Sequence, residues 1–251
     1  MPRDLRSEKT PLNAESLASP PYVNPLTLAN DKNPKMKELR PYCLLLNESD
    51  LDDCDWLEHA AFDPNEAASR EKLEYRLVTC GELCSGIFAS AYQTNPDPIG
   101  SVIRSRKFPS VDSAHSDRKR VLLGHIIATK STSDKVTDGS MSFPTDWRTN
   151  YRLDPPNGHH EEGDTICLHS LCVHPSFHKR GLGAVLLKGW TQRIRDAGLG
   201  KRIALICHDY LVPFYERAGF KKIGPSACQY GGGNWIDMIM EFDEPGQNAS
   251  W

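Results

Sequence analysis

Apolar and polar residues along this chain form two kinds of repeating pattern, which predict strands and helices. Short apolar runs predict strands at residues 41–46, 85–92, 121–129, 166–173, 201–207, 221–228 and 235–242. Apolar residues at helical spacing predict helices at 50–61, 65–77, 182–197 and 211–220. Strands and helices therefore interleave along the chain.

Other stretches lack this periodicity. Residues 1–36 are rich in Pro, Ser, Asn and Lys, which predicts a disordered N-terminal arm, and residues 244–251 are predicted to form a C-terminal tail. Residues 93–119 and 131–164 are polar and contain prolines, and stretches of this length inside a compact domain are typical of mobile insertions. The remaining chain, 37–243, is long enough to form one domain with a substantial core.

The charge balance argues against several classes of partner. With 30 basic and 33 acidic residues, the chain carries no excess charge that would favour nucleic acid or an anionic membrane surface. Its eight cysteines form no CxxC pair, which favours reduced thiols and a cytoplasmic protein. No apolar run has the length of a signal peptide or a membrane span. A small molecule in a pocket is the expected ligand, and a monomer is the default state.

The stretch 165–197 carries the clearest chemical signal. A buried strand ends before Pro175, and the turn His178-Lys179-Arg180-Gly181-Leu182-Gly183 then opens a helix. The two glycines let a ligand approach the backbone, the first helical turn offers unpaired N–H groups, and the basic pair adds positive charge. A polyphosphate is therefore the expected guest. The Gly-Lys-Ser/Thr ending of a Walker loop is missing, and Leu186 stands where a dinucleotide fingerprint has its third glycine.

This loop resembles motif A of the GNAT superfamily of N-acetyltransferases, Arg/Gln-x-x-Gly-x-Gly/Ala, with His178 at the Arg/Gln position. Residues 201–220 resemble motif B of the same superfamily. The run 168–225 is similar to the arylalkylamine (serotonin) N-acetyltransferase branch, whose patterns Leu-His-x-Leu-x-Val-His and Val-Pro-Phe-Tyr-x-Arg-x-x-Phe it shares. The resemblance implies an α/β (α+β) GNAT fold, with a mixed, mostly antiparallel sheet of about seven strands, flanked by helices and splayed at its central strands.

The resemblance also implies acetyl-coenzyme A as co-substrate. Its pantetheine arm would pair with the strand backbone and its diphosphate with the glycine turn, which assigns coenzyme contacts to Leu171, Cys172, Val173, Lys179, Arg180, Gly181, Leu182, Gly183 and Ala184. The acetyl group would pass directly to a small primary amine in a ternary complex. Arylalkylamines such as serotonin or tryptamine are the favoured acceptors, and polyamines, a broader amine set, or a protein N-terminus or lysine are alternatives. A coenzyme-A-binding module without turnover is the alternative from another class.

The same resemblance assigns the catalytic residues. An alkylamine has a pKa of about 10, so its nitrogen must lose a proton before it attacks a thioester, and His169 is the expected base. The family has a second histidine where this chain has Cys167, and strand alternation is expected to place residues 167, 169, 171 and 173 on one face. Tyr215 matches the family's general acid, and the backbone N–H of Leu171 is the expected oxyanion donor. For the side chains of His169 and Tyr215, a packing role is the alternative.

Acceptor contacts are expected from several elements. Phe62 and Pro64 lie in the loop that closes over the amine in that family, although Phe62 equally fits a core position between two helices. Thr129 matches a family serine near the amine, and Cys167 and Phe214 complete the set. No metal is expected, because the cluster His159-His160-Glu161-Glu162-Asp164 lacks evident ligand spacing. A partner that binds the N-terminal arm after phosphorylation is left open.

Overall fold

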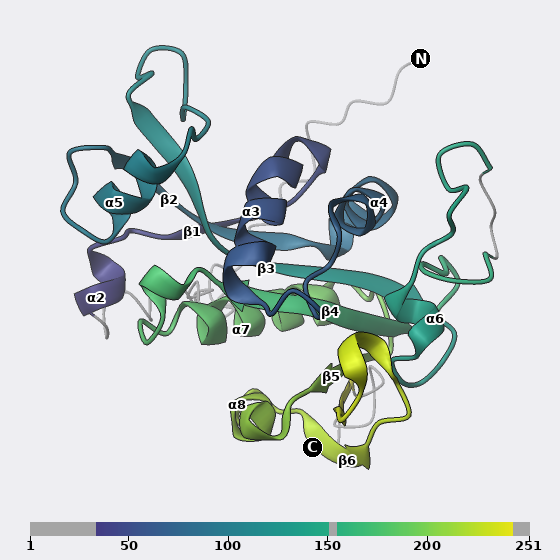
Figure 1. Cartoon of the computed structure of the whole chain (residues 1–251). Coiled ribbons are helices and arrows are strands. Elements are labelled where there is room, and N and C mark those ends of the chain that lie inside the picture. Colours follow the sequence, from purple (N-terminus) through teal and green to yellow (C-terminus); the bar gives the residue numbers. More distant parts are fainter. Residues whose placement is uncertain (1–33, 151–154, 243–251) are drawn as a thin grey trace, which may run out of the picture.

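The computed structural model describes residues 34–150 and 155–242, and a seven-stranded open sheet forms the centre of this part of the chain (Figure 1). The strand order is β1-β2-β3-β4-β5-β7-β6. The strands are β1 Tyr42–Leu45, β2 Ser85–Tyr92, β3 Arg118–Ser131, β4 Thr165–Val173, β5 Arg202–Cys207, β6 Lys221–Pro225 and β7 Ile236–Glu241. Each neighbouring pair is antiparallel except β4 and β5, which run parallel. The predicted mixed, mostly antiparallel sheet is confirmed.

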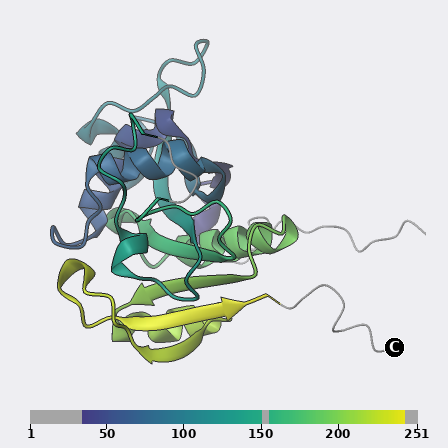
Figure 2. The ribbon, with the colours of Figure 1, turned by 90° about the vertical axis from the view of Figure 1, so that its right-hand side faces the viewer.

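Helices lie on both faces of this sheet. Helices α3 (Leu51–Ala61) and α4 (Arg70–Cys80) lie together on one face, over β3, and α7 (Leu182–Asp196) lies on the other (Figures 1 and 2). Helix α5 (Ile99–Ser105) packs on β2, and α8 (Val212–Arg217) packs on β6 and β7. Two short helices are α2 (Pro34–Lys37) and α6 (Asp138–Met141). Within residues 34–150 and 155–242, no helix has the length and apolar character that crossing a membrane requires.

Capping side chains decide where the helices on the first face begin. Asn47 and Asp50 form a reciprocal capping box just before α3. The side chain of Ser69 accepts a hydrogen bond from the N–H of Lys72, so α4 begins at Arg70 rather than at the predicted residue 65. Both helices bury leucines against the sheet, and these belong to one apolar cluster with Phe88. The predicted pair of helices is therefore present, with the second one shifted along the chain.

Two segments predicted to lie outside the packed core, the insertion 93–119 and the arm 1–36, contain buried apolar side chains. Residues 93–119 do not form a purely polar insertion, since Ile99, Val102 and Phe108 are buried in the core and the first two belong to α5. The predicted arm 1–36 ends inside a packed helix, because Met36 of α2 is only 1% exposed. The rest of that arm, residues 1–33, and the predicted tail at 244–251 lie outside the described residues.

The central strands β4 and β5 separate part-way along their length. They pair from Thr165 with Arg202 to Leu168 with Leu205, and beyond that point β4 pairs only with β3. The register between β3 and β4 also shifts here, since Ile127 faces Ser170 while the next residue of β3 faces Leu168. His169 is therefore the extra residue of a β-bulge, a distortion that redirects a side chain. The expected splay of the central strands is present in the structure.

This bulge overturns the expectation that residues 167, 169, 171 and 173 share one face. Cys167 belongs to an apolar cluster with Met141, whereas Leu171 and Val173 pack against the large cluster that includes α7. One inserted residue moves every later side chain to the opposite face of a strand. His169 thus lies where the two alternation patterns meet.

Candidate active site

A cavity of about 450 Å³ opens where β4 and β5 separate. One wall is formed by β4, the opposite wall by β5 and the segment after it, and the end of α3 closes a third side. The lining residues are Glu58, Ala61, Phe62, Asp63, Glu66, Met141, Leu168, His169, Leu171, Cys172, Val173, His178, Ile206, Cys207, His208, Tyr210, Leu211, Tyr215, Tyr230 and Trp235. Many residues expected from the sequence therefore meet in one place.

The imidazole of His169 is held by two neighbours. Its Nε2 lies 2.8 Å from the hydroxyl of Thr129, and its Nδ1 lies 3.1 Å from the sulfur of Met141. A thioether has no proton to donate, so Nδ1 carries the hydrogen and Nε2 accepts from Thr129. Burial and the positive charges of Arg76 and Lys72 lower the pKa of His169 well below its usual 6.5. The ring is neutral at neutral pH and presents a lone pair on Nε2.

Tyr215 lies on α8 across the cavity, and only 6% of its surface is exposed. Its ring makes edge-on contacts with Phe214 and Phe220, at centroid distances of 5.0 Å and 5.6 Å. Burial raises the pKa of this phenol above 10, with Cys207 and Tyr210 adding to the effect. Tyr215 therefore stays protonated at neutral pH and can act as a proton donor.

Glu58, which the sequence analysis missed, brings a buried carboxylate to the cavity. It accepts hydrogen bonds from the N–H of Ala68 (3.0 Å), from His125 (2.8 Å) and from the hydroxyl of Ser170 (2.7 Å). Burial by itself would raise the pKa of Glu58, but the bonds from His125 and Ser170 lower it below its usual value. The group is therefore ionised. A histidine inside the apolar run 121–129 was the available signal that a buried acid would be needed.

Two further carboxylates lie on the same side of the cavity. Asp63 follows α3 in the turn, and Glu66 lies 3.0 Å from the imidazole of His208. The aromatic rings of Phe62, Tyr230 and Trp235 line the same cavity as these acids. This end of the cavity therefore suits a cation that carries an apolar body.

Glu58, His125 and Cys172 offer side-chain atoms that all lie within 4.8 Å of one another, a spacing that suits a metal ion. The carboxylate and the imidazole are, however, hydrogen-bonded to each other. Burial raises the pKa of the Cys172 thiol well above 9, so the thiolate that metals bind is disfavoured. The donor set thus fits a hydrogen-bonded network better than a metal centre.

The glycine turn begins α7 with left-handed backbone at Lys179 (φ 58°) and Gly181 (φ 81°). A β-carbon added at Gly183 would lie 3.6 Å from Val173 and 4.0 Å from Phe214, which is ordinary contact. The protein's own packing therefore tolerates a β-carbon at Gly183, next to the unpaired N–H groups of the first helical turn, Leu182–Ala184. An anion at this helix start would be stabilised by these N–H groups and by the helix dipole.

Two side chains of this turn already have partners within the protein. The side chain of Arg180 donates to the carbonyl of Lys35 (3.1 Å) and lies 3.8 Å from Glu38, so it points toward the segment that contains α2. Nε2 of His178 donates to the carbonyl of Val173 at 2.7 Å. The Val173 carbonyl, part of the backbone expected to pair with a pantetheine arm, thus accepts a hydrogen bond from the residue that departs from motif A.

Four predicted acceptor residues do not line the cavity. Thr129 is hydrogen-bonded to the lining residue His169 but does not itself line the cavity. Asp63 lines the cavity, whereas its neighbour Pro64 does not. Cys167 is fully buried, and burial raises its pKa to about 12 despite side-chain hydrogen bonds with Ser140 and Ser131. Phe214 packs on Tyr215, outside the lining.

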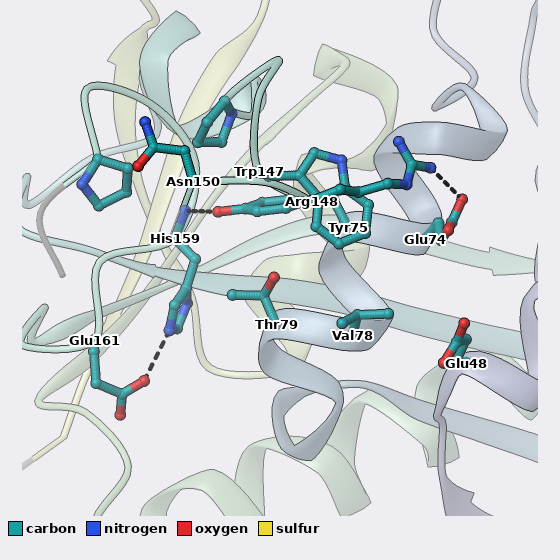
Figure 3. Close-up of a pocket in the computed structure, with 12 residues that line it drawn as sticks. Glu48, Glu74, Tyr75, Val78, Thr79, Trp147, Arg148, Asn150, His159 and Glu161 are labelled. Atoms are coloured by element: carbon teal, nitrogen blue, oxygen red, sulfur yellow. Dashed lines mark hydrogen bonds and ion pairs between the residues drawn. The ribbon is translucent and has the colours of Figure 1, made fainter. Parts of the chain in front are cut away.

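A second hollow of about 520 Å³ lies on the outer face of α4 (Figure 3). Its charged groups are largely paired, since Arg148 bonds to Glu71 and Glu74, and His159 bonds to Glu161. Figure 3 shows Tyr75 beside this hollow, where its hydroxyl accepts the N–H of His159. None of the residues that line it belongs to the splayed end of β4, so this hollow is not the candidate reaction site.

The comparison with protein families agrees with this fold. Residues 115–242, about half of the chain, match the family described as "Acetyltransferase (GNAT) domain". The chain therefore belongs to the GNAT acetyltransferase family.

Within that family, the curated relatives it resembles include serotonin N-acetyltransferases. The chain is 38% identical to the Mesocricetus auratus protein and 36% identical to the Homo sapiens protein, each over 80 residues, which are 32% of this chain. It spans 39% of the length of each of these relatives.

Solved structures show the same fold at low identity. The loading GNATL domain of CurA from Lyngbya majuscula has a TM-score of 0.52 and 13% identity, over 79% of this chain and 96% of that chain. The NatC complex bound to Gag peptide and CoA has a TM-score of 0.51 and 15% identity, over 81% of this chain and 99% of that chain. These similarities describe the fold.

Proposed function

We propose that this protein transfers the acetyl group of acetyl-coenzyme A directly to a small primary amine in a ternary complex. One observation carries the proposal: a neutral imidazole whose Nε2 is an acceptor, a protonated phenol and the unpaired edge of β4 converge on one cavity. Acetyl transfer needs a proton acceptor and a proton donor, and we assign these roles to His169 and Tyr215. Membership of the acetyltransferase family supports the same reaction.

Acetyl-coenzyme A fits the residues of the glycine turn. Its diphosphate would lie against the N–H groups of Leu182–Ala184, with positive charge from Lys179, and its pantetheine arm would run along the unpaired edge of β4 at Leu171. When bound, the coenzyme supplies an activated acetyl thioester. The N–H of Leu171 on that edge would hold the oxygen that becomes negatively charged during transfer.

Proton movements follow from the side chains. The ammonium of the substrate loses a proton through a water molecule to Nε2 of His169, the ring nitrogen that also accepts a hydrogen bond from Thr129. The neutral nitrogen then forms a bond to the acetyl carbon, the bond from that carbon to sulfur breaks, and Tyr215 gives its proton to the sulfur. The nitrogen, now positively charged, loses its second proton through water to the phenolate of Tyr215, and His169 releases the first proton to solvent. One amide and one thiol result, and no redox partner is required.

The carboxylates Glu58, Asp63 and Glu66 support an acceptor that arrives as an ammonium ion, and the rings of Phe62 and Trp235 support an apolar body. Arylalkylamines such as tryptamine or serotonin combine these features and are our first choice. The similarity to serotonin N-acetyltransferases supports the same class. A polyamine is the second candidate, because the three acidic side chains that line the cavity suit a substrate with more than one positive charge.

Thiol release from acetyl-coenzyme A, measured with tryptamine, spermidine and a lysine peptide, tests the proposal. We expect amine-dependent thiol release and an N-acetylated product with tryptamine, spermidine or both. Release with the lysine peptide alone would move the function to proteins. Binding of coenzyme A without turnover on any amine would contradict an enzyme and favour a regulatory binding module.

Replacing Gly183 by alanine should weaken coenzyme binding without harming the fold. The added methyl group fits the protein, since its contacts are 3.6 Å or longer, but it occupies space assigned to the diphosphate. We expect KM for acetyl-coenzyme A to rise about tenfold, with the melting temperature unchanged or slightly higher. Gly189→Ala in the same helix is the matched control, because nothing lies within 4 Å of its β-carbon position. Equal KM values for both variants would place the diphosphate elsewhere.

Replacing Asp63 by asparagine should weaken acceptor binding more for a polyamine than for a monoamine. The carboxylate lines the cavity, and neutralising it removes one attractive charge. We expect KM for spermidine to rise about fivefold and KM for tryptamine about twofold, with KM for acetyl-coenzyme A unchanged. Asp117→Asn, an exposed acid that does not line this cavity, serves as the control. Unchanged KM values for both amines would remove Asp63 from the acceptor site.

A further inference from the structure

Arg76 on α4 is a charged residue in an apolar setting. It heads the set of largest fully buried side chains, with 1% of its surface exposed. Within the described part of the chain it forms no ion pair, its Nη2 donates to the carbonyl of Met141 (3.1 Å), and its buried Nε has no hydrogen-bond partner. Burying a guanidinium without a carboxylate in contact costs free energy of folding. Loss of the hydrogen bond from Arg76 to the Met141 carbonyl would raise that cost further. The buried charge of Arg76 therefore needs a functional explanation.

The partner of Arg76 leads directly to the candidate base. Met141 accepts from Arg76 through its backbone oxygen, and its side-chain sulfur lies 3.1 Å from Nδ1 of His169. The other ring nitrogen, Nε2, lies on Thr129. A chain of contacts therefore runs from α4 through the end of α6 to the imidazole. Each link fixes the next one.

The same insertion is also fastened to the outer face of α4. Tyr75, the neighbour of Arg76, accepts the N–H of His159 at 2.9 Å (Figure 3). Tyr75 also contacts the rings of Phe143 and Trp147. Met141 and His159 are thus each hydrogen-bonded to a residue of α4, which gives Met141 a fixed support.

We infer that Arg76 is a positioning residue for acetyl transfer: it holds Met141 against His169, so that Nδ1 keeps its hydrogen and Nε2 remains the accepting atom beside Thr129. The inference deepens the proposed function and rests on His169 as the base. Neither Arg76 nor Met141 was singled out by the sequence motifs. Arg76 does not line the cavity, so it acts through Met141 and through its charge.

The charges around His169 support this role. Arg76 and Lys72 come from α4, Glu58 from α3, Tyr215 from α8 and Tyr230 from the segment before β7, while Thr129 of β3 and Met141 are uncharged. Burial first, and then Arg76 and Lys72, lower the pKa of His169. Burial and Arg76 also lower the pKa of Lys72 to about 8. Removing the fixed charge of Arg76 therefore favours protonation of the imidazole, because one of the two positive charges that disfavour it is lost.

The test compares Arg76→Met, which removes the charge and the hydrogen bond, with Arg76→Lys, which keeps the charge. The ¹⁵N chemical shifts of the His169 ring, followed against pH, report its tautomer and its titration midpoint without any turnover. For Arg76→Met we expect the midpoint to rise by about one pH unit and kcat to fall about tenfold, with KM for acetyl-coenzyme A unchanged. Arg76→Lys should keep the wild-type midpoint and recover part of kcat.

Arg193→Met is the matched control. Arg193 on α7 likewise donates to a backbone carbonyl, that of Glu82 at 2.6 Å, and also has a buried Nε without a partner. It is expected to leave the His169 ring signals unchanged. Met141→Leu, which removes the sulfur but keeps the volume, should convert part of the ring to the other tautomer and serves if Arg76→Met does not fold.

Unchanged ring signals in Arg76→Met or Met141→Leu would overturn the inference, even if the protein acetylates amines as proposed. Conversely, ring signals that move as expected would support the inference in a protein that failed every amine assay, so the two failures are distinguishable. An equal shift in Arg193→Met would reduce the effect to a general loss of positive charge and would also overturn it.

Discussion

Replacing Tyr215 by phenylalanine is expected to lower kcat about 100-fold, while KM for acetyl-coenzyme A changes less than about twofold. The phenol is buried at the cavity, and burial raises its pKa, so at neutral pH it is always protonated and able to give a proton to the departing sulfur. Phenylalanine keeps the edge-on ring contacts with Phe214 and Phe220, so the fold should not change. Steady-state thiol release at saturating amine measures the effect.

Tyr92→Phe is the matched control for that experiment, because Tyr92 lies at the end of β2, away from this cavity, and is 37% exposed. It should leave kcat and KM unchanged. A Tyr215→Phe enzyme with wild-type kcat would assign Tyr215 to packing. A large rise in KM for acetyl-coenzyme A would assign it to coenzyme binding instead.

Replacing His169 by glutamine is expected to lower kcat by about 100- to 1,000-fold at pH 7, with the deficit shrinking as the pH approaches 10. Glutamine can hydrogen-bond to Thr129 but cannot accept a proton. At low pH nearly all of the amine is protonated and a base is needed, whereas near its own pKa of about 10 the amine loses its proton to water. The pH dependence of kcat for both enzymes measures the effect.

The direction of the His169 pKa adds a second expectation. A lowered pKa means that the folded protein keeps this ring unprotonated as the pH falls through 6.5, the value of the unfolded chain. The acid limb of the wild-type profile, where His169 gains a proton, should therefore lie below pH 6.5. His115→Gln, an exposed ring paired with Asp112, is the control and should match the wild type. A His169→Gln deficit that stays constant from pH 6 to pH 10 would contradict a role in proton removal.

Most of the fold was predictable because it depends on local patterns. Each predicted strand overlaps the strand found, since short apolar runs such as 166–173 are typical of strands buried in a sheet. The glycine turn was predictable for a similar reason, because left-handed backbone at Gly181 leaves its mark on residue type. The helix at 99–105 was missed because Ile99, Val102 and Ile103 lie among polar and proline residues that lower the average apolar character.

The candidate site was predictable only in part. His169 and Tyr215 lie in recognisable motifs, and both line the cavity. The bulge at His169 has no sequence signature, so the faces of Cys167 and Leu171 were predicted to be the same when they are opposite. Strand alternation is a local rule, and one extra residue in the pairing of two distant strands defeats it.

Long-range contacts account for the rest. The hydrogen bond between Glu58 and Ser170 connects positions 112 residues apart in the sequence, and the one between Arg76 and Met141 connects positions 65 residues apart. An acidic residue in an amphipathic helix and an arginine in the next helix are both ordinary on a solvent-facing surface. The structure shows both side chains buried, and in the proposed function their charges would act on His169 and on the acceptor amine.

A structure of the complex with a bisubstrate compound, in which coenzyme A is joined to tryptamine through an acetyl bridge, tests the central claim most directly. We expect its diphosphate on the N–H groups of Leu182–Ala184, its sulfur within about 3.5 Å of the Tyr215 hydroxyl, and its amine nitrogen within one water molecule of His169. Phosphates bound away from the start of α7, or an amine separated from His169 by packed side chains, would contradict the account.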